Sequence, residues 1–201
     1  MKRQSRPKPS QPPKAAGHNS LRIIGGQWRG RKLSFAELDG LRPTGDRIRE
    51  TLFNWLMPTI HGARCLDLFS GSGALGFEAL SRGAAEVVML DREPRVAARL
   101  RQHVQTLDAQ GAQVSQTDAT QWLANPGPQS AFDIVFVDPP FALDLWQPVI
   151  SALEAGPLLA EHALIYIESD RQTPLATPPQ WALLKEKHSG QVSYRLFQRQ
   201  V

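Results

Sequence analysis

From residue 63 onward, short apolar segments alternate with segments whose apolar residues recur at helical spacing. Phe132–Val137 is apolar at nearly every position, whereas Glu93–Ala109 carries Val96, Leu100 and Val104 on one helical face. Strands that are apolar on both sides are typical of parallel sheets covered by helices on both faces. The alternation therefore predicts an α/β fold built on a mostly parallel sheet.

The expected elements follow from this pattern. Two final strand-like runs surround His188-Ser189-Gly190 and predict a hairpin that adds an antiparallel edge. The seven expected strands are 63–69, 86–91, 113–118, 132–137, 163–169, 181–187 and 192–199, and the expected helices are 74–82, 93–109, 119–123 and 145–155. Upstream, Leu21–Ile24 and Lys32–Phe35 predict a small hairpin, and residues 42–57 predict a helix that Thr44 caps.

Charge is distributed unevenly along the 201 residues. Residues 1–49 hold 12 Lys/Arg and 3 Asp/Glu, a net charge of +9, and residues 50–201 hold 11 Lys/Arg and 16 Asp/Glu, a net charge of −5; together they give +4. A basic first quarter favours a polyanionic partner. We expect residues 1–20 to form a disordered basic arm, residues 21–45 a hairpin and linker that contact RNA, and residues 46–201 the catalytic domain.

Basic residues interleaved with an aromatic one occupy the turn of the first hairpin. Such a surface suits phosphates together with a stacked base. The alternative is an edge hairpin whose cations only block aggregation. We predict nucleic-acid contacts at Arg22, Trp28, Arg29, Arg31, Lys32 and Arg47.

Composition restricts the class of protein to which the chain can belong. No run of about 18 apolar residues predicts a membrane span, and no apolar stretch follows the basic N-terminus as in a secretory signal. Cys65 is the single cysteine, and the five histidines lack metal-ligand spacing, so we expect no disulfide and no metal site. We expect a cytoplasmic monomer that does not associate with membranes.

A glycine-rich segment follows the first strand of the sheet. Gly71, Gly73 and Gly76 match G-x-G-x-x-G between a strand and a helix, where a cofactor approaches the backbone. Asp91 ends the second strand, about 20 residues later, where an acid holds ribose hydroxyls. Asp67 lies just before the glycines and would repel a pyrophosphate but attract an amine. The loop therefore favours S-adenosylmethionine.

Asp138-Pro139-Pro140-Phe141 ends the fourth strand, at the same edge of the sheet. A carboxylate and a backbone carbonyl held by prolines can accept both hydrogens of an amino group. Phe141 adds a flat face for a base. The tetrapeptide predicts a site that aims the exocyclic amine of a nucleobase at the cofactor.

Three strings, RIIGGQWRGRKL, RPTGDRIRETLFNWL and LDLFSGSGALGFEALSRGA, together with DPPF, resemble the bacterial RsmD family. The resemblance covers residues 21–201 and implies a class I, Rossmann-like methyltransferase fold that methylates N2 of guanine 966 in 16S rRNA. It implies as substrate an assembled or late-assembling small ribosomal subunit. The implied catalytic residues are Asp138, Pro139, Pro140 and Phe141, and the implied cofactor-binding residues are Arg42, Thr44, Asp67, Phe69, Gly71, Gly73, Asp91, Arg92, Asp118 and Ala119.

Three alternatives share parts of this pattern. An adenine-N6 methyltransferase acting on DNA or RNA would use the same motifs, because DPPF serves several amines. A nicotinamide-dependent oxidoreductase would use the glycine loop but leaves Asp67 and DPPF unexplained. A non-catalytic RNA-binding or ribosome-assembly factor would retain the fold without the chemistry.

Overall fold

A mixed sheet of seven strands forms the centre of the molecule, here described from a computed structural model for residues 19–35 and 45–200. Its order is β5-β4-β3-β6-β7-β9-β8, and only β9 runs antiparallel to its neighbours. The strands are β3 (Arg64–Asp67), β4 (Glu86–Asp91), β5 (Ala112–Gln116), β6 (Phe132–Val137), β7 (Leu159–Asp170), β8 (Trp181–Ser189) and β9 (Val192–Arg199). The predicted mostly parallel sheet with a C-terminal hairpin is confirmed.

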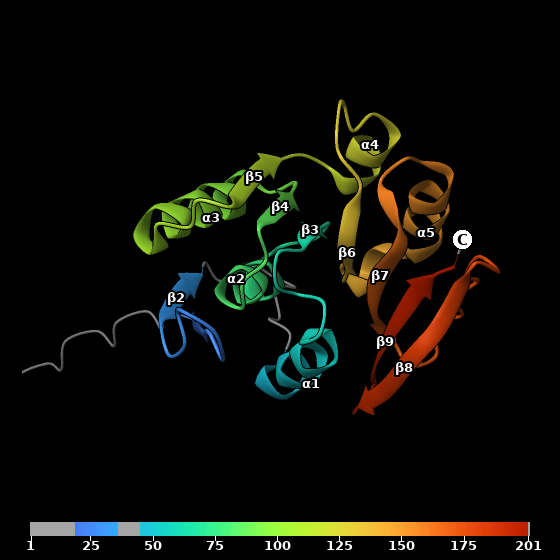
Figure 1. The fold of residues 1–201 in the computed structure, drawn as a ribbon, viewed down its shortest axis with the longest axis horizontal. Helices are drawn as coiled ribbons and strands as arrows, with labels where there is room; N and C mark the ends of the chain where they lie inside the picture. The colour runs from blue at the N-terminus through green and yellow to red at the C-terminus, as the bar shows by residue number, and fades with distance from the viewer. Residues whose placement is uncertain (1–18, 36–44, 201) are drawn as a thin grey trace, which may run out of the picture.

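Helices cover both faces of the sheet, as Figure 1 shows. One apolar cluster joins the sheet to α1 (Asp46–Leu56), α2 (Ala74–Ser81) and α3 (Pro94–Leu107). A second joins the opposite face to α4 (Ala119–Ala124) and α5 (Trp146–Ala155). This explains why the central strands are apolar at consecutive positions: Ile134, Val135, Phe136 and Val137 are all fully buried, alternately in the two clusters.

The order of the strands places a crevice at one edge. The chain runs from β3 outward through β4 to β5 and then returns to β6 on the other side of β3. Helices on either side of such a switch point diverge, and ligands bind there, outside the carboxyl ends of the strands. Asp67 is the register partner of Phe136, so the segments after β3 and β6 emerge side by side.

A separate two-stranded hairpin, β1 (Asn19–Arg22) and β2 (Lys32–Phe35), packs beside α2 and α3. Leu21 and Leu33 are register partners and both are buried. The strand β1 begins earlier than predicted, because Asn19 and Ser20 pair with Phe35 and Ser34. Beyond Arg22 the same register continues into the loop, where the Ile23 N–H donates to Arg31 O at 3.0 Å. The predicted boundary of the arm at residue 20 is therefore wrong by two residues, since Asn19 and Ser20 belong to β1.

Two other boundaries differ from expectation. Helix α1 begins at Asp46 rather than near residue 42, and Gly45 occupies its N-cap position. Thr44, the predicted cap, lies outside the described residues. Strand β7 begins at Leu159 rather than near 163, because Leu159 pairs with Phe132 across an irregularity in the register. None of the helices between residues 45 and 200 has the length and apolarity needed to cross a membrane.

Candidate active site

The glycine loop connects β3 to α2 through backbone conformations that favour glycine. Gly71 and Gly73 have φ values of +49° and +79°. A Cβ atom at Gly73 would lie 2.5 Å from the Phe77 ring. Gly73 is also the residue before α2, and its carbonyl accepts from Phe77 N at 2.9 Å. The motif is therefore a strand-to-helix turn packed too tightly for side chains.

Asp67, at the end of β3, is a buried carboxylate facing the first turn of α2. Its Oδ2 accepts from Gly76 N at 3.2 Å. A Cβ atom at Gly76 would lie 2.7 Å from Met89 Sδ, so the third glycine lets the helix approach the strand. Burial raises the pKa of Asp67 to about 7, although hydrogen bonds from Ser70 and Gly76 oppose the rise. None of the ion pairs within the described chain includes Asp67, so this site suits an added cation.

Asp91 ties the end of β4 to the glycine loop. Its Oδ2 accepts from Gly71 N at 3.0 Å, and its Oδ1 accepts from Glu93 N at 2.8 Å. Burial raises the pKa of Asp91, and these two backbone donors work against that shift. Each carboxylate oxygen has a second lone pair, so the arrangement leaves acceptor capacity for a hydroxyl ligand.

The remaining predicted cofactor residues fall at the neighbouring strand ends. Asp118 caps α4, because its Oδ1 accepts from Thr120 N at 2.9 Å and Gln121 N at 3.2 Å. The Thr120 hydroxyl, which also bonds Oδ1, lowers the pKa of Asp118. Ala119 is buried, Phe69 packs against the second apolar cluster, and Arg92 is exposed; Arg42 and Thr44 lie outside the described residues.

The Asp-Pro-Pro-Phe segment leaves β6 beside this loop. Asp138 is half-buried, Pro139 is buried and Pro140 is exposed. Pro140 precedes a short 3-10 turn, Phe141–Leu143, and the Phe141 ring is 40% exposed while it contacts Trp146 at a centroid distance of 5.5 Å. The segment thus presents a carboxylate and an aromatic face at the edge where the glycine loop lies.

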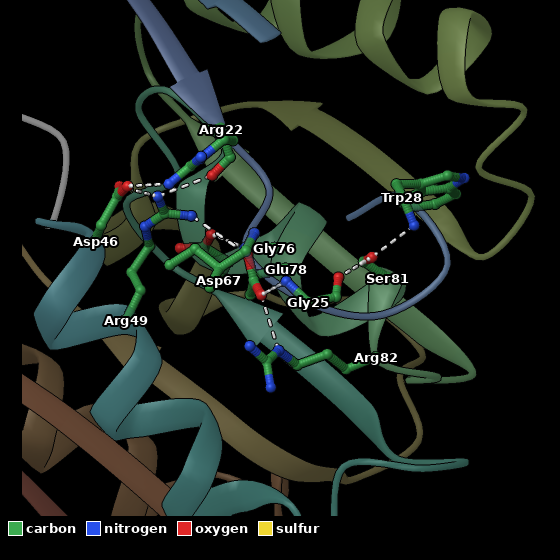
Figure 2. Close-up of polar contacts among 11 residues, drawn as sticks. Arg22, Gly25, Trp28, Asp46, Arg49, Asp67, Gly76, Glu78, Ser81 and Arg82 are labelled. Atoms are coloured by element: carbon green, nitrogen blue, oxygen red, sulfur yellow. Dashed lines mark hydrogen bonds and ion pairs between the residues drawn. The ribbon is translucent and has the colours of Figure 1, made fainter. Parts of the chain in front are cut away.

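A buried acid that sequence analysis overlooked, Glu78 of α2, binds three separate segments (Figure 2). Its two carboxylate oxygens accept from the backbone N–H groups of Ile24 and Gly25, both at 2.8 Å. Arg49 of α1 lies 3.3 Å away and Arg82 lies 2.8 Å away. We define these five residues as the Glu78 cluster. In the sequence, the only indication of this role is a single acid within the mostly apolar segment ALGFEALS.

Arg49 is a cation of the basic N-terminal part of the chain that does not lie on the surface. Its side chain is fully buried, and its guanidinium also bonds Asp46 Oδ1 at 2.6 Å and Arg22 O at 3.0 Å. It is therefore part of the framework and not of the surface. In the same basic segment Arg47 is exposed, as an RNA contact requires.

The loop of the hairpin is bound to the end of α2. Ser81 Oγ donates to Gly25 O at 2.6 Å and accepts from Trp28 N at 3.0 Å. At Gly26, with φ +75°, a Cβ atom would lie 1.7 Å from Ser81 O, so only glycine fits this contact. Trp28 is half-buried and packs against the core, and it lines a pocket of about 250 Å³ with Leu80 and Ala84.

The predicted RNA-binding cations lie mostly on the outside of the hairpin. Arg29, Arg31 and Lys32 are exposed. The Arg31 guanidinium reaches Thr106 O at 3.4 Å, and Arg22 lies 3.8 Å from Asp46 in an exposed ion pair. The hairpin therefore presents a basic surface that the Glu78 cluster holds against α2.

The strand order, with the glycine loop and DPPF at its switch point, defines the class I methyltransferase fold. The family described as "Conserved hypothetical protein 95" matches residues 21–198. The chain is 51% identical over 190 residues to "Ribosomal RNA small subunit methyltransferase D" of Haemophilus influenzae, covering 94% of this chain and 97% of that protein. It is 50% identical to the protein of that name from Escherichia coli K12, covering 94% and 95%.

A solved Escherichia coli structure, described as that of methyltransferase yhhF, superposes with a TM-score of 0.84 and 48% identity, covering 91% of this chain and 99% of that one. The family model matches most of the chain, and relatives about 50% identical cover nearly all of it. The chain belongs to this family, that of the ribosomal RNA small subunit methyltransferases D.

Glu78→Gln tests the cluster. Glutamine removes the charge that faces Arg49 and Arg82 and turns an N–H donor toward other donors. We expect the free energy of unfolding to fall by about 3–5 kcal/mol, as for a broken buried ion pair. Glu186→Gln removes an ion pair with Arg195 on exposed β8 and should cost about 0–1 kcal/mol. Urea denaturation measures both; equal small losses would contradict the central role of Glu78.

Proposed function

We propose that this protein transfers a methyl group from S-adenosylmethionine to the exocyclic N2 of guanine 966 in 16S rRNA of the small ribosomal subunit. One observation carries the proposal. Asp67, a buried carboxylate with no ion pair among the described residues, and the proposed amine-accepting segment at Asp138 emerge from adjacent strands in a chain half-identical to ribosomal RNA small subunit methyltransferases D.

The residues at the switch point fit this cofactor. Asp67 would hold the methionine ammonium, directly or through water, because its burial makes an unpaired charge costly. Asp91 would accept the ribose hydroxyls while it keeps the glycine loop in place through Gly71. Asp118 and Ala119 would hold the adenine, and Phe69 and Arg92 lie on the segments that flank it. Arg42 and Thr44 remain proposals from sequence.

When bound, S-adenosylmethionine would supply an electrophilic methyl group, which would pass from its sulfonium sulfur to the guanine nitrogen and leave a neutral thioether. The protein must activate the nucleophile, because the lone pair of the guanine amine is delocalised into the ring. Hydrogen bonds from both amine hydrogens to Asp138 and the Pro139 carbonyl favour a tetrahedral nitrogen. Positioning for in-line attack contributes several kcal/mol, up to about 7–11 kcal/mol in oriented intramolecular reactions.

Asp138 also provides a place for the proton that the methylated amine loses. An ordinary carboxylate, with a pKa of about 4, is a weak base for this step. We therefore assign Asp138 to orientation and charge stabilisation first and to proton acceptance second. Pro139 and Pro140 keep the carbonyl rigid, and the exposed Phe141 ring supplies the face on which the base stacks.

Affinity for RNA would come from the hairpin. Arg29, Arg31 and Lys32 are exposed, and the Glu78 cluster fixes their strand to the helix that follows the glycine loop. Phosphate contacts there would orient the rRNA while the target base enters the crevice. An exposed rRNA loop lowers the cost of extruding that base, which is otherwise a few kcal/mol. We propose an assembled or late-assembling subunit as the substrate.

The deciding experiment is labelled methyl transfer to small subunits that lack the modification, compared with free 16S rRNA. We expect N2-methylguanosine at position 966 and higher turnover on subunits. Asp138→Ala should keep cofactor affinity within about twofold and lose nearly all turnover, because the amine is no longer oriented. Asp144→Asn, at an exposed position after the same segment, is the control. N6-methyladenosine as product, or an active Asp138→Ala variant, would overturn these assignments.

Cofactor affinity should depend on pH through Asp67. The ammonium binds the ionised carboxylate, and the free protein holds the proton on Asp67 up to a pKa of about 7. Binding below that pH must release this proton, so affinity should rise with pH between roughly 6 and 7 and level off above about 8. Calorimetric titration across this range measures the change. Asp67→Asn should bind weakly and without this dependence; an equal slope in both proteins would contradict the role.

The proposed role of the hairpin in RNA binding predicts how RNA affinity depends on salt concentration. Neutralising Arg29, Arg31 and Lys32 to glutamine should weaken RNA binding and reduce the slope of log K against log salt by up to about 2–3, since each lost phosphate contact contributes about 0.7–0.9. The control neutralises three exposed cations outside the hairpin, Arg171, Lys185 and Lys187. Equal effects of the two triple variants would show that the hairpin is not the RNA surface.

A further inference from the structure

Glu168 lies near the end of β7 and has no role in the mechanism above. Phe136 and Val137 of β6 pair with Tyr166 and Ile167 of β7, so the next position on each strand is Asp138 and Glu168. Phe136 and Tyr166 belong to the same apolar cluster, beneath α1, α2 and α3. Because side chains alternate along strands, Asp138 and Glu168 fall on that same face, on strands roughly 4.8 Å apart.

The Glu168 carboxyl is buried with a single neutral donor. The residue is 6% exposed, and Tyr166 OH donates to its Oε2 at 2.9 Å. None of the ion pairs among residues 19–35 and 45–200 includes it. Burial raises the pKa of Glu168, and the tyrosine only partly opposes the rise. A further hydrogen-bond donor in this position would therefore be stabilising.

Glu168 belongs to the same framework as the DPPF segment. Trp146 Nε1 donates to the backbone carbonyl of Glu168 at 2.8 Å, and the Trp146 ring contacts Phe141. On the other side, Tyr194 of β9 is the register partner of Glu168 and stacks against Trp55 of α1 at 5.5 Å. The carboxyl thus lies between the segment that holds the amine and an aromatic wall.

The neighbouring groups of a target amine distinguish the bases. In guanine the N2 amine is adjacent to N1–H, a second donor. In adenine the N6 amine is adjacent to N1, an acceptor. A carboxylate beside the amine site therefore attracts guanine and repels adenine, and a site that leaves a buried polar group unpaired rejects the wrong ligand strongly.

We propose that Glu168 determines the choice of base: its carboxylate accepts the N1–H of guanine while Asp138 and the Pro139 carbonyl receive the N2 amine. The inference rests on the proposed function and deepens it, since DPPF by itself accepts any exocyclic amine. Tyr166 and Trp146 act as positioning residues that hold the Glu168 side chain and backbone.

The test uses small subunits assembled from 16S rRNA that carries either guanine or 2-aminopurine at the target position. 2-Aminopurine keeps the 2-amino group, but its N1 is an acceptor. We expect the wild-type protein to prefer guanine by about 10- to 100-fold in kcat/KM, the effect of one hydrogen bond to a charged group. Glu168→Gln should reduce this preference to within about threefold, because its amide N–H can donate to the N1 of 2-aminopurine.

Glu154→Gln is the matched control. Glu154 lies on α5 and accepts from Trp181 Nε1 at 2.8 Å and from Arg199, so it resembles Glu168 in having an aromatic donor. Its variant should keep the wild-type preference. Cofactor binding verifies that each variant is folded, and Glu168→Asp, which keeps the charge, should still favour guanine if Glu168→Gln does not fold.

The outcomes separate the inference from the proposed function. If the wild-type protein methylates the two bases at equal rates, the proposed role of Glu168 is overturned, and no variant is needed to show it. An unchanged preference in folded Glu168→Gln would also overturn it, while N2-methylguanosine from the wild type would leave the proposed function intact. Absence of N2-methylguanosine from the wild-type reaction would instead overturn the proposed function, and this inference with it.

Discussion

A single buried carboxylate, that of Glu78, holds together parts of the molecule that no strand pairing connects. It accepts from the backbone of Ile24 and Gly25 and faces Arg49 and Arg82. A buried charge is costly unless it is paired and fully hydrogen-bonded, so these partners must all be present together. Because α2 starts at the glycine loop, the same carboxylate relates the hairpin to the cofactor-binding turn.

The acidic and basic parts of the chain have separate places in the fold. Asp67, Asp91 and Asp138 lie at the carboxyl edge of the sheet, where a cationic cofactor and an amine would meet acceptors. Those carboxylates would repel RNA phosphates at short range. The basic hairpin lies beside α2 and α3, so the proposed phosphate binding and methyl transfer would use different surfaces of one framework.

Much of this architecture could be predicted from local pattern. β4 and β6 have the predicted bounds, because a strand buried on both faces appears in the sequence as a nearly continuous apolar run. The hydrogen bond between Asp67 and Gly76 could also have been predicted, since both residues belong to one strand-turn-helix unit. Asp118 caps α4, a role that is compatible with its proposed contact with adenine.

Ion pairs between residues far apart in the sequence could not be predicted from local pattern. Arg49 looked like one more cation in a basic segment, but its partner Glu78 is 29 residues away and neither has a local signal of pairing. Trp28 suggested a stacking platform, yet it packs against the core. β1 begins earlier than predicted because Asn19 and Ser20, which are not apolar, pair with Phe35 and Ser34.

The local order of residues is thus enough to predict the α/β class, the switch-point loop and the position of the DPPF segment, because each depends on neighbours within a few residues. Three features are decided only when distant segments pack. These are the burial of particular acids, the cations with which they pair, and the strand ends that lie together. Glu168 shows the difference: it is one acid in a strand until β6 brings Asp138 beside it.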